Sequence, residues 1–133
     1  MERLYPRSME TLPIILEAVA AFCAGHGAAG DSTFVISFAV EEIFTNMVKY
    51  NPLGPDNVSL TLMSKGNDLV VTLEDEQDHM FDPTTSPDPE FEKSLSERRP
   101  GGLGLFLIKK MVRKVEYRRE GRRNTITLTH PLE

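Results

Sequence analysis

The sequence predicts a two-layer α/β sandwich in which the helices lie together on one face of a sheet. Three observations support this fold class. Most predicted strands follow one another in pairs typical of hairpins, two predicted helices are consecutive, and a third helix lies between the hairpins. The chain has 133 residues, of which 40% are hydrophobic and 26% charged, and this size and composition predict a single domain over residues 1–133.

The first part of the chain is predicted to contain an edge strand and two helices. The segment Arg3 to Ser8 is suited to a short edge strand. From Leu12 to Phe22 the apolar residues recur at steps of three and four, which is the spacing of an amphipathic helix, and a glycine-rich stretch ends this helix. Asp31 and Ser32 offer an N-cap to a second helix that extends to about Tyr50.

The second part is predicted to contain two hairpins separated by a long loop and a helix. Residues 58–62 and 69–73 are strand-like runs joined by a turn at 65–68. The next segment is rich in charges and prolines, and its length is typical of a mobile lid, placed at about residues 77–100. A third helix follows to about Lys114, and residues 115–119 and 125–129 form the last hairpin.

Composition excludes several function classes. The net charge of −5 argues against a general affinity for nucleic acid or anionic membranes. The longest apolar stretch, residues 14–24, is too short to span a bilayer, and the N-terminus lacks the apolar core of a signal peptide. The single cysteine, Cys23, excludes an internal disulfide and a multi-cysteine zinc site. A cytoplasmic protein that binds neither nucleic acid nor membrane directly is expected.

One face of the second predicted helix carries polar side chains. Glu42 and Asn46 are four residues apart and share this face, and Lys49 continues it, whereas Glu41 points roughly 100° away. These side chains form either a solvated polar stripe or a magnesium-nucleotide site. For the second alternative, the Asn oxygen suits a hard cation, Lys can face phosphate, and Glu can accept a proton.

Two further segments have the chemistry of a ligand site. Asp75 lies where the second strand of the first hairpin ends, as either a solvated carboxylate or an acceptor for a ligand amino group. The glycines at 101, 102 and 104 precede the third helix, where unpaired backbone N–H groups favour an anion. The GGLG pattern alone is weak, and its spacing does not match a P-loop.

Four segments, taken together and in order, resemble the conserved boxes of the GHKL ATPases. Residues 42–50 resemble the N box, Asp75 the G1 box, residues 102–105 the G2 box, and residues 124–128 the final strand. The likeness extends over nearly the whole chain and is greatest to the small anti-sigma factor serine-protein kinases of the RsbW and SpoIIAB type. It implies the Bergerat fold, which is a mixed, mostly antiparallel sheet with three helices on one face and ATP between the helices and a flexible lid.

The resemblance also implies roles for individual residues and partners. The kinases of this type use ATP and Mg²⁺ to phosphorylate a serine or threonine of a STAS-domain anti-anti-sigma protein, capture or release a sigma factor according to that phosphorylation, and often form homodimers. The implied site residues are Glu42 as the catalytic carboxylate, Asn46 as the Mg²⁺ ligand, Lys49 as a phosphate contact, Asp75 as the acceptor for the adenine amino group, Gly102 and Gly104 as the lid hinge beside the phosphates, and Thr125 near the adenine.

One box departs from the family pattern. The G1 box reads Asp-x-Gly-x-Gly, whereas this chain has Gln77 and His79 at the two glycine positions. Side chains at these positions intrude on the nucleotide or force a detour of the backbone. The alternative function is therefore a binding module with weak or no catalysis that regulates a partner by sequestration. Retention of Glu42 and Asn46 favours the kinase.

A third interpretation is the ATP-binding half of a histidine kinase. Such a protein needs a dimerising helical domain that carries the phosphoacceptor histidine. Too few residues precede the N box to supply that domain.

Overall fold

The structure is a computed structural model that describes residues 1–50, 57–77, 83–85 and 102–133. Its elements, in chain order, are β1 (Glu2–Tyr5), the 3₁₀ helix η1 (Met9–Thr11), α1 (Leu12–Gly25), α2 (Gly30–Tyr50), β2 (Val58–Lys65), β3 (Asp68–Glu76), the 3₁₀ helix η2 (Pro83–Thr85), α3 (Gly102–Met111), β4 (Lys114–Glu120) and β5 (Arg123–Pro131).

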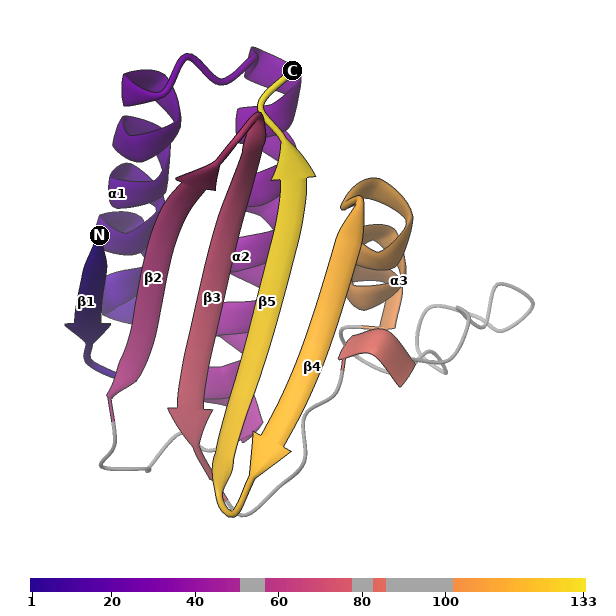
Figure 1. The fold of residues 1–133 in the computed structure, drawn as a ribbon. Helices are drawn as coiled ribbons and strands as arrows, with labels where there is room; N and C mark the ends of the chain where they lie inside the picture. Colours follow the sequence, from indigo (N-terminus) through magenta and orange to yellow (C-terminus); the bar gives the residue numbers. More distant parts are fainter. Residues whose placement is uncertain (51–56, 78–82, 86–101) are drawn as a thin grey trace.

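The five strands form one sheet in the order β1-β2-β3-β5-β4. Each of the four strand pairings in the described residues is antiparallel. The helices lie on one face of this sheet, with α2 behind its centre, α1 toward the β1 edge and α3 toward the β4 edge (Figure 1). The predicted two-layer fold with helices on one face is confirmed.

Alternation along the central strands builds the core. The residues of β2, β3 and β5 that face the helices are buried and apolar, and helix residues with the same property pack against them. The largest of these buried side chains are Ile15, Ile36, Ile43, Phe44, Met47, Leu60, Leu62, Leu69, Leu73, Ile108, Ile126 and Leu128.

At one end of the sheet the buried face becomes polar. On β3 the series of buried residues continues beyond Leu73 to Asp75 and then to Gln77, which directly follows the strand. Asn124 lies on the neighbouring strand β5, where it is paired with Asp75, and it is also fully buried. The same two-residue period that builds the core therefore places polar side chains between the sheet and the helices.

The element boundaries agree with the sequence predictions, with small differences. Gly66 and Gly121 lie in the two hairpin turns with positive φ angles of 61° and 59°, which glycine adopts without strain. The third helix ends at Met111, earlier than predicted, because Lys114 already belongs to β4. Cys23 is buried as predicted.

Part of the predicted lid lies outside the described residues. Of residues 77–100, the structure describes Gln77 and the short helix η2, whereas His79 belongs to the part that is not described. None of the described helices is both long and apolar enough to cross a membrane.

Candidate functional site

The polar face of α2 contains two of the predicted site residues one turn apart. Asn46 is buried, and its Nδ2 donates a hydrogen bond to the Glu42 carbonyl oxygen at 2.7 Å. Because that carbonyl can only accept, the amide nitrogen faces it, and the carboxamide oxygen remains the atom that can accept a bond or bind a cation. Lys49, near the end of the helix, is exposed to solvent.

The Glu42 carboxyl group has a perturbed proton affinity. Partial burial raises its pKa above the usual value for glutamate, and the nearby negative charge of Glu41 raises it further. The positive charge of Lys49 opposes this rise. A carboxylate with a raised pKa holds a proton more strongly, which suits it to general-base chemistry.

The first turn of α3 lies directly on the Glu42 side chain. A Cβ atom built on Gly104 would come within 2.6 Å of the Glu42 Cγ and would overlap the rest of that side chain up to the carboxylate. A side chain at position 104 would therefore force the Glu42 carboxyl group to move, and glycine leaves it in place against α3. The structure thus brings together Gly104, Glu42 and the start of α3 at Gly102, where unpaired backbone N–H groups are expected.

Asp75 lies at the centre of a buried polar cluster. Its Oδ2 accepts hydrogen bonds from Arg7 Nη1 at 2.9 Å and from Gln77 Nε2 at 2.7 Å. The Arg7 and Asp75 side chains are 1% and 0% exposed, so this is a buried ion pair. Arg7 also donates to the carbonyl oxygens of Met47 and Glu76 at 3.0 and 3.2 Å, which ties the connection after β1 to α2 and β3.

The proton affinity of Asp75 is set by opposing effects. Burial raises the pKa of its carboxyl group, and this is the largest effect. The hydrogen bond and positive charge of Arg7 lower it, and so do interactions with Asn124 and Gln77. The ionised form of Asp75 therefore depends on its neighbours, of which Arg7 is the most important.

Asn124 connects this cluster to β4. Its Oδ1 accepts hydrogen bonds from the Tyr117 hydroxyl at 2.5 Å and from Arg119 Nη1 at 3.0 Å. Arg119 Nη2 also donates to the Gln77 carbonyl oxygen at 3.1 Å. The end of β3 is therefore held from both sides by arginine side chains.

Thr125, the residue that the resemblance assigns to the neighbourhood of the adenine, does not belong to the Asp75 cluster. Successive residues of a strand point to opposite faces of the sheet. Asp75 is paired with Asn124, whereas Thr125 is paired with Glu74 on the face away from the helices. The residue of β5 beside Asp75 is Asn124, one position earlier.

Sequence reasoning missed Arg7 and Asn124 as members of the site. The position of Asn124 could have been predicted, because residues two apart on a strand share a face and the apolar Ile126 lies on the buried face. Arg7 is a single charged residue in a short irregular segment, and no periodic pattern marks it.

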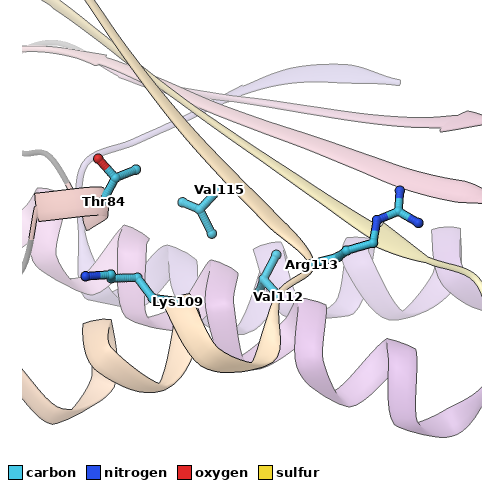
Figure 2. Close-up of a pocket in the computed structure, with 5 residues that line it drawn as sticks. All are labelled: Thr84, Lys109, Val112, Arg113 and Val115. Carbon is cyan, nitrogen blue, oxygen red and sulfur yellow. The ribbon is translucent and has the colours of Figure 1, made fainter.

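Separate from these residues, a shallow hollow of about 200 Å³ lies between η2, α3 and β4. Figure 2 shows its lining side chains, Thr84, Lys109, Val112, Arg113 and Val115. None of them is a predicted site residue. In the described part of the chain, no group of three or more His, Cys, Asp or Glu side chains is placed to hold a metal ion.

Known proteins are similar to this chain in sequence and fold. The serine/threonine-protein kinase BtrW of Bordetella bronchiseptica is 29% identical over 98 residues, which are 72% of this chain and 68% of BtrW. The solved structure of the RsbU and RsbW domains of Rv1364c from Mycobacterium tuberculosis matches 98% of this chain with a TM-score of 0.72 and 14% identity. This chain covers 31% of that longer chain.

A second solved structure, the SiaB-SiaC complex from Pseudomonas aeruginosa, matches 98% of this chain and 88% of the compared chain, with a TM-score of 0.63 and 13% identity. The family model of the histidine kinase-like ATPase domain matches residues 5–130, which is nearly the whole chain. This protein therefore belongs to the histidine kinase-like ATPase domain family, in agreement with its resemblance to the GHKL ATPases.

Proposed function

We propose that this chain is an ATP- and Mg²⁺-dependent protein serine/threonine kinase that acts as an anti-sigma factor in the cytoplasm. Its substrate is a STAS-domain anti-anti-sigma protein, and its second partner is a sigma factor or an equivalent regulator. The observation that carries the proposal is the position of Glu42, which has a raised pKa, lies against Gly104 and is one turn from Asn46. The similarity to the kinase BtrW supports the same reaction class.

In the proposed reaction Glu42 is the general base. Its carboxylate accepts the proton of the substrate serine hydroxyl, while the serine oxygen forms a bond to the γ-phosphorus of ATP. The bond from that phosphorus to the oxygen bridging to the β-phosphate breaks, and ADP leaves. General-base assistance of this kind contributes about 100- to 10,000-fold in rate, and positioning supplies much of the remainder.

The residues near Glu42 fit a magnesium-nucleotide complex. The Asn46 carboxamide oxygen suits Mg²⁺, which prefers oxygen ligands and is commonly held by one or two protein groups together with phosphates and water. When bound, Mg²⁺ neutralises part of the phosphate charge. Lys49 and the backbone N–H groups at the start of α3, near Gly102 and Gly104, would bind the phosphates, and Asp75 would accept a hydrogen bond from the adenine.

The product explains how such a kinase could switch partners. A phosphoserine carries a charge of about −1.5 to −2 at neutral pH, and at an interface it acts through repulsion and desolvation. Phosphorylation of the STAS protein would release it, and the kinase would then be available to capture the sigma factor. The fold match to a protein solved in complex with a partner, SiaB with SiaC, supports partner binding, and a homodimer is part of the same proposal.

The direct test is transfer of labelled phosphate from ATP to a purified STAS-domain protein. Asn46→Ala is expected to reduce labelling at least about tenfold, because the proposed side-chain ligand of the charge-neutralising Mg²⁺ is lost. Asn57→Ala, at an exposed position just before β2, is the matched control and should leave labelling unchanged. Equal labelling by the Asn46→Ala protein and the unmodified protein would remove Asn46 from the site.

Gly104→Ala provides a geometric test of the Glu42 position. The added Cβ would collide with the Glu42 side chain and displace its carboxylate, so we expect a loss of phosphotransfer of about tenfold or more. Alanine favours the helix by about 1 kcal/mol over glycine, so global unfolding is not the expected cause. Gly30→Ala is the control, because a Cβ atom there meets nothing within 4 Å. Both variants should therefore unfold at a midpoint similar to that of the unmodified protein, whereas only Gly104→Ala should lose phosphotransfer.

A binding module with little or no catalysis is the second candidate, and the Asp75 cluster favours it. Arg7 and Gln77 already donate hydrogen bonds to Asp75 Oδ2, so only the other carboxylate oxygen is left to accept a hydrogen bond from a base. Isothermal titration with Mg-ATP separates the two candidates. If the folded protein does not bind nucleotide at millimolar concentration, the kinase proposal fails and sequestration of a partner remains.

A further inference from the structure

Two hydrogen-bond acceptors in the Asp75 cluster are buried without a donor. Asp75 Oδ1 and Gln77 Oε1 have no hydrogen-bond partner at bonding distance in the part of the chain that the structure describes, and both residues are at most 2% exposed. The Asn124 side chain interacts with the Asp75 carboxylate and lowers its pKa, but no donor atom of the described residues lies at bonding distance from Oδ1. Buried polar atoms in folded proteins are almost always satisfied, so two adjacent exceptions require an explanation. A ligand that supplies two donors would satisfy both.

The orientation of the Gln77 side chain follows from its neighbour. The ionised Asp75 carboxylate can only accept hydrogen bonds, so the Gln77 amide must turn its NH₂ group toward Asp75 Oδ2, at 2.7 Å. The Gln77 oxygen is then directed away from that bond. The hydrogen bond between Gln77 and Asp75 also holds the two unsatisfied oxygens, Asp75 Oδ1 and Gln77 Oε1, in the same buried region at the end of β3.

The charge of the cluster restricts the kind of donor. Arg7 and Asp75 form an ion pair whose net charge is zero, Gln77 is neutral, and the neighbouring Arg119 adds a positive charge. A cationic ammonium group would bring an uncompensated charge into this buried environment. A neutral group with two N–H bonds is preferred, and the exocyclic amino group of adenine is such a group.

We propose that Gln77 is a base-recognition residue whose carboxamide oxygen accepts one N–H of the adenine amino group while Asp75 Oδ1 accepts the other. This inference rests on the proposed function, because it takes ATP as the nucleotide. The proposal assigns a role to the Gln77 side chain, which occupies a position where the related ATPases have glycine. It also predicts discrimination against guanine, which carries a carbonyl oxygen at the same ring position and would face two acceptors.

The test compares three nucleotides by isothermal titration with Mg²⁺: ATP, GTP and purine riboside triphosphate, which has a hydrogen in place of the amino group. The unmodified protein should bind ATP at least about tenfold more tightly than either of the others. Gln77→Leu should weaken ATP binding by about tenfold and leave purine riboside triphosphate within about twofold. Glu76→Leu, at the neighbouring position on the opposite face of β3, is the control and should not change the selectivity.

Gln77→Gly serves as a second variant, because it restores the residue typical of the family and removes any strain from an apolar side chain. If Gln77 recognises the base, glycine also weakens ATP binding. If Gln77 fills the base position instead, glycine tightens ATP binding, and the proposal is wrong. Unchanged affinity in both variants would overturn it as well, and a buried water would then satisfy the two oxygens. Failure of the unmodified protein to bind ATP overturns the proposed function together with this inference.

Discussion

Replacing Glu42 with glutamine is expected to lower the rate of phosphotransfer to a STAS substrate by about 100- to 10,000-fold. Glutamine has nearly the same size and preserves the contact with Gly104, but its amide cannot accept the serine proton. Nucleotide affinity should change little, because the proposed role of Glu42 is limited to the proton. Single-turnover transfer from labelled ATP measures the rate, and titration with Mg-ATP measures the affinity. A variant that retains more than a tenth of the rate would exclude Glu42 as the base.

Glu41→Gln is the matched control, since it makes the same chemical change one residue earlier at an exposed position. The rate at high pH should remain unchanged. The base must be deprotonated to act, so activity is lost as pH falls through the pKa of Glu42, which burial and Glu41 raise. Removing the Glu41 charge lowers that pKa, so the acid limb of the rate profile should move to lower pH. A limb that moves to higher pH would contradict this assignment.

Arg7→Met is expected to lower the free energy of unfolding by about 3–5 kcal/mol, the range observed when one partner of a buried ion pair is removed. The Asp75 carboxylate would remain buried without its cation, and the carbonyl oxygens of Met47 and Glu76 would lose a donor. Urea denaturation of the variant and of the unmodified protein measures the difference. Arg3→Met, on the exposed part of β1, is the control and should cost less than about 1 kcal/mol.

The pH dependence of the stability lost in Arg7→Met distinguishes the contribution of the arginine charge from that of its packing. Burial raises the pKa of folded Asp75, so folding favours its protonated form. The stability associated with this preference is present at low pH and is lost as pH rises through the raised pKa. Without Arg7 the pKa rises further, because the interactions that lower it are removed. The destabilisation by Arg7→Met should therefore shrink as the pH is lowered. A loss that does not depend on pH would indicate packing of the arginine side chain instead.

Much of the fold could be predicted because its elements have clear periods. The helical spacing of apolar residues gives α1 and α2 close to their observed bounds, and the two hairpins follow from short turns that contain Gly66 and Gly121. The order of the strands could not be predicted in this way. The pairings of β1 with β2 and of β3 with β5 join segments that are distant in the chain, and a local pattern contains no information about them.

The arrangement of the candidate site was predictable where helix geometry determines it. Glu42 and Asn46 are four residues apart on a helix, so their proximity follows from the sequence. Thr125 shows the limit in strands, because a shift of one residue changes the face of the sheet, and the residue paired with Asp75 is Asn124. The contact of Arg7 with Asp75 depends on how a short segment after β1 crosses the end of the sheet, which only the folded structure determines.

The ion pair between Arg7 and Asp75 also has a consequence for the order of folding events. The two residues are 68 positions apart in the chain, and β1, which leads to Arg7, is the edge strand next to β2 in the described sheet. Contacts of such long range pay a large loop-closure cost before they contribute stability. We therefore expect the hairpin of β2 and β3 to form first and the Arg7 contact to close late, so that its loss mainly accelerates unfolding. The end of β3 that contains Asp75 would be completed last.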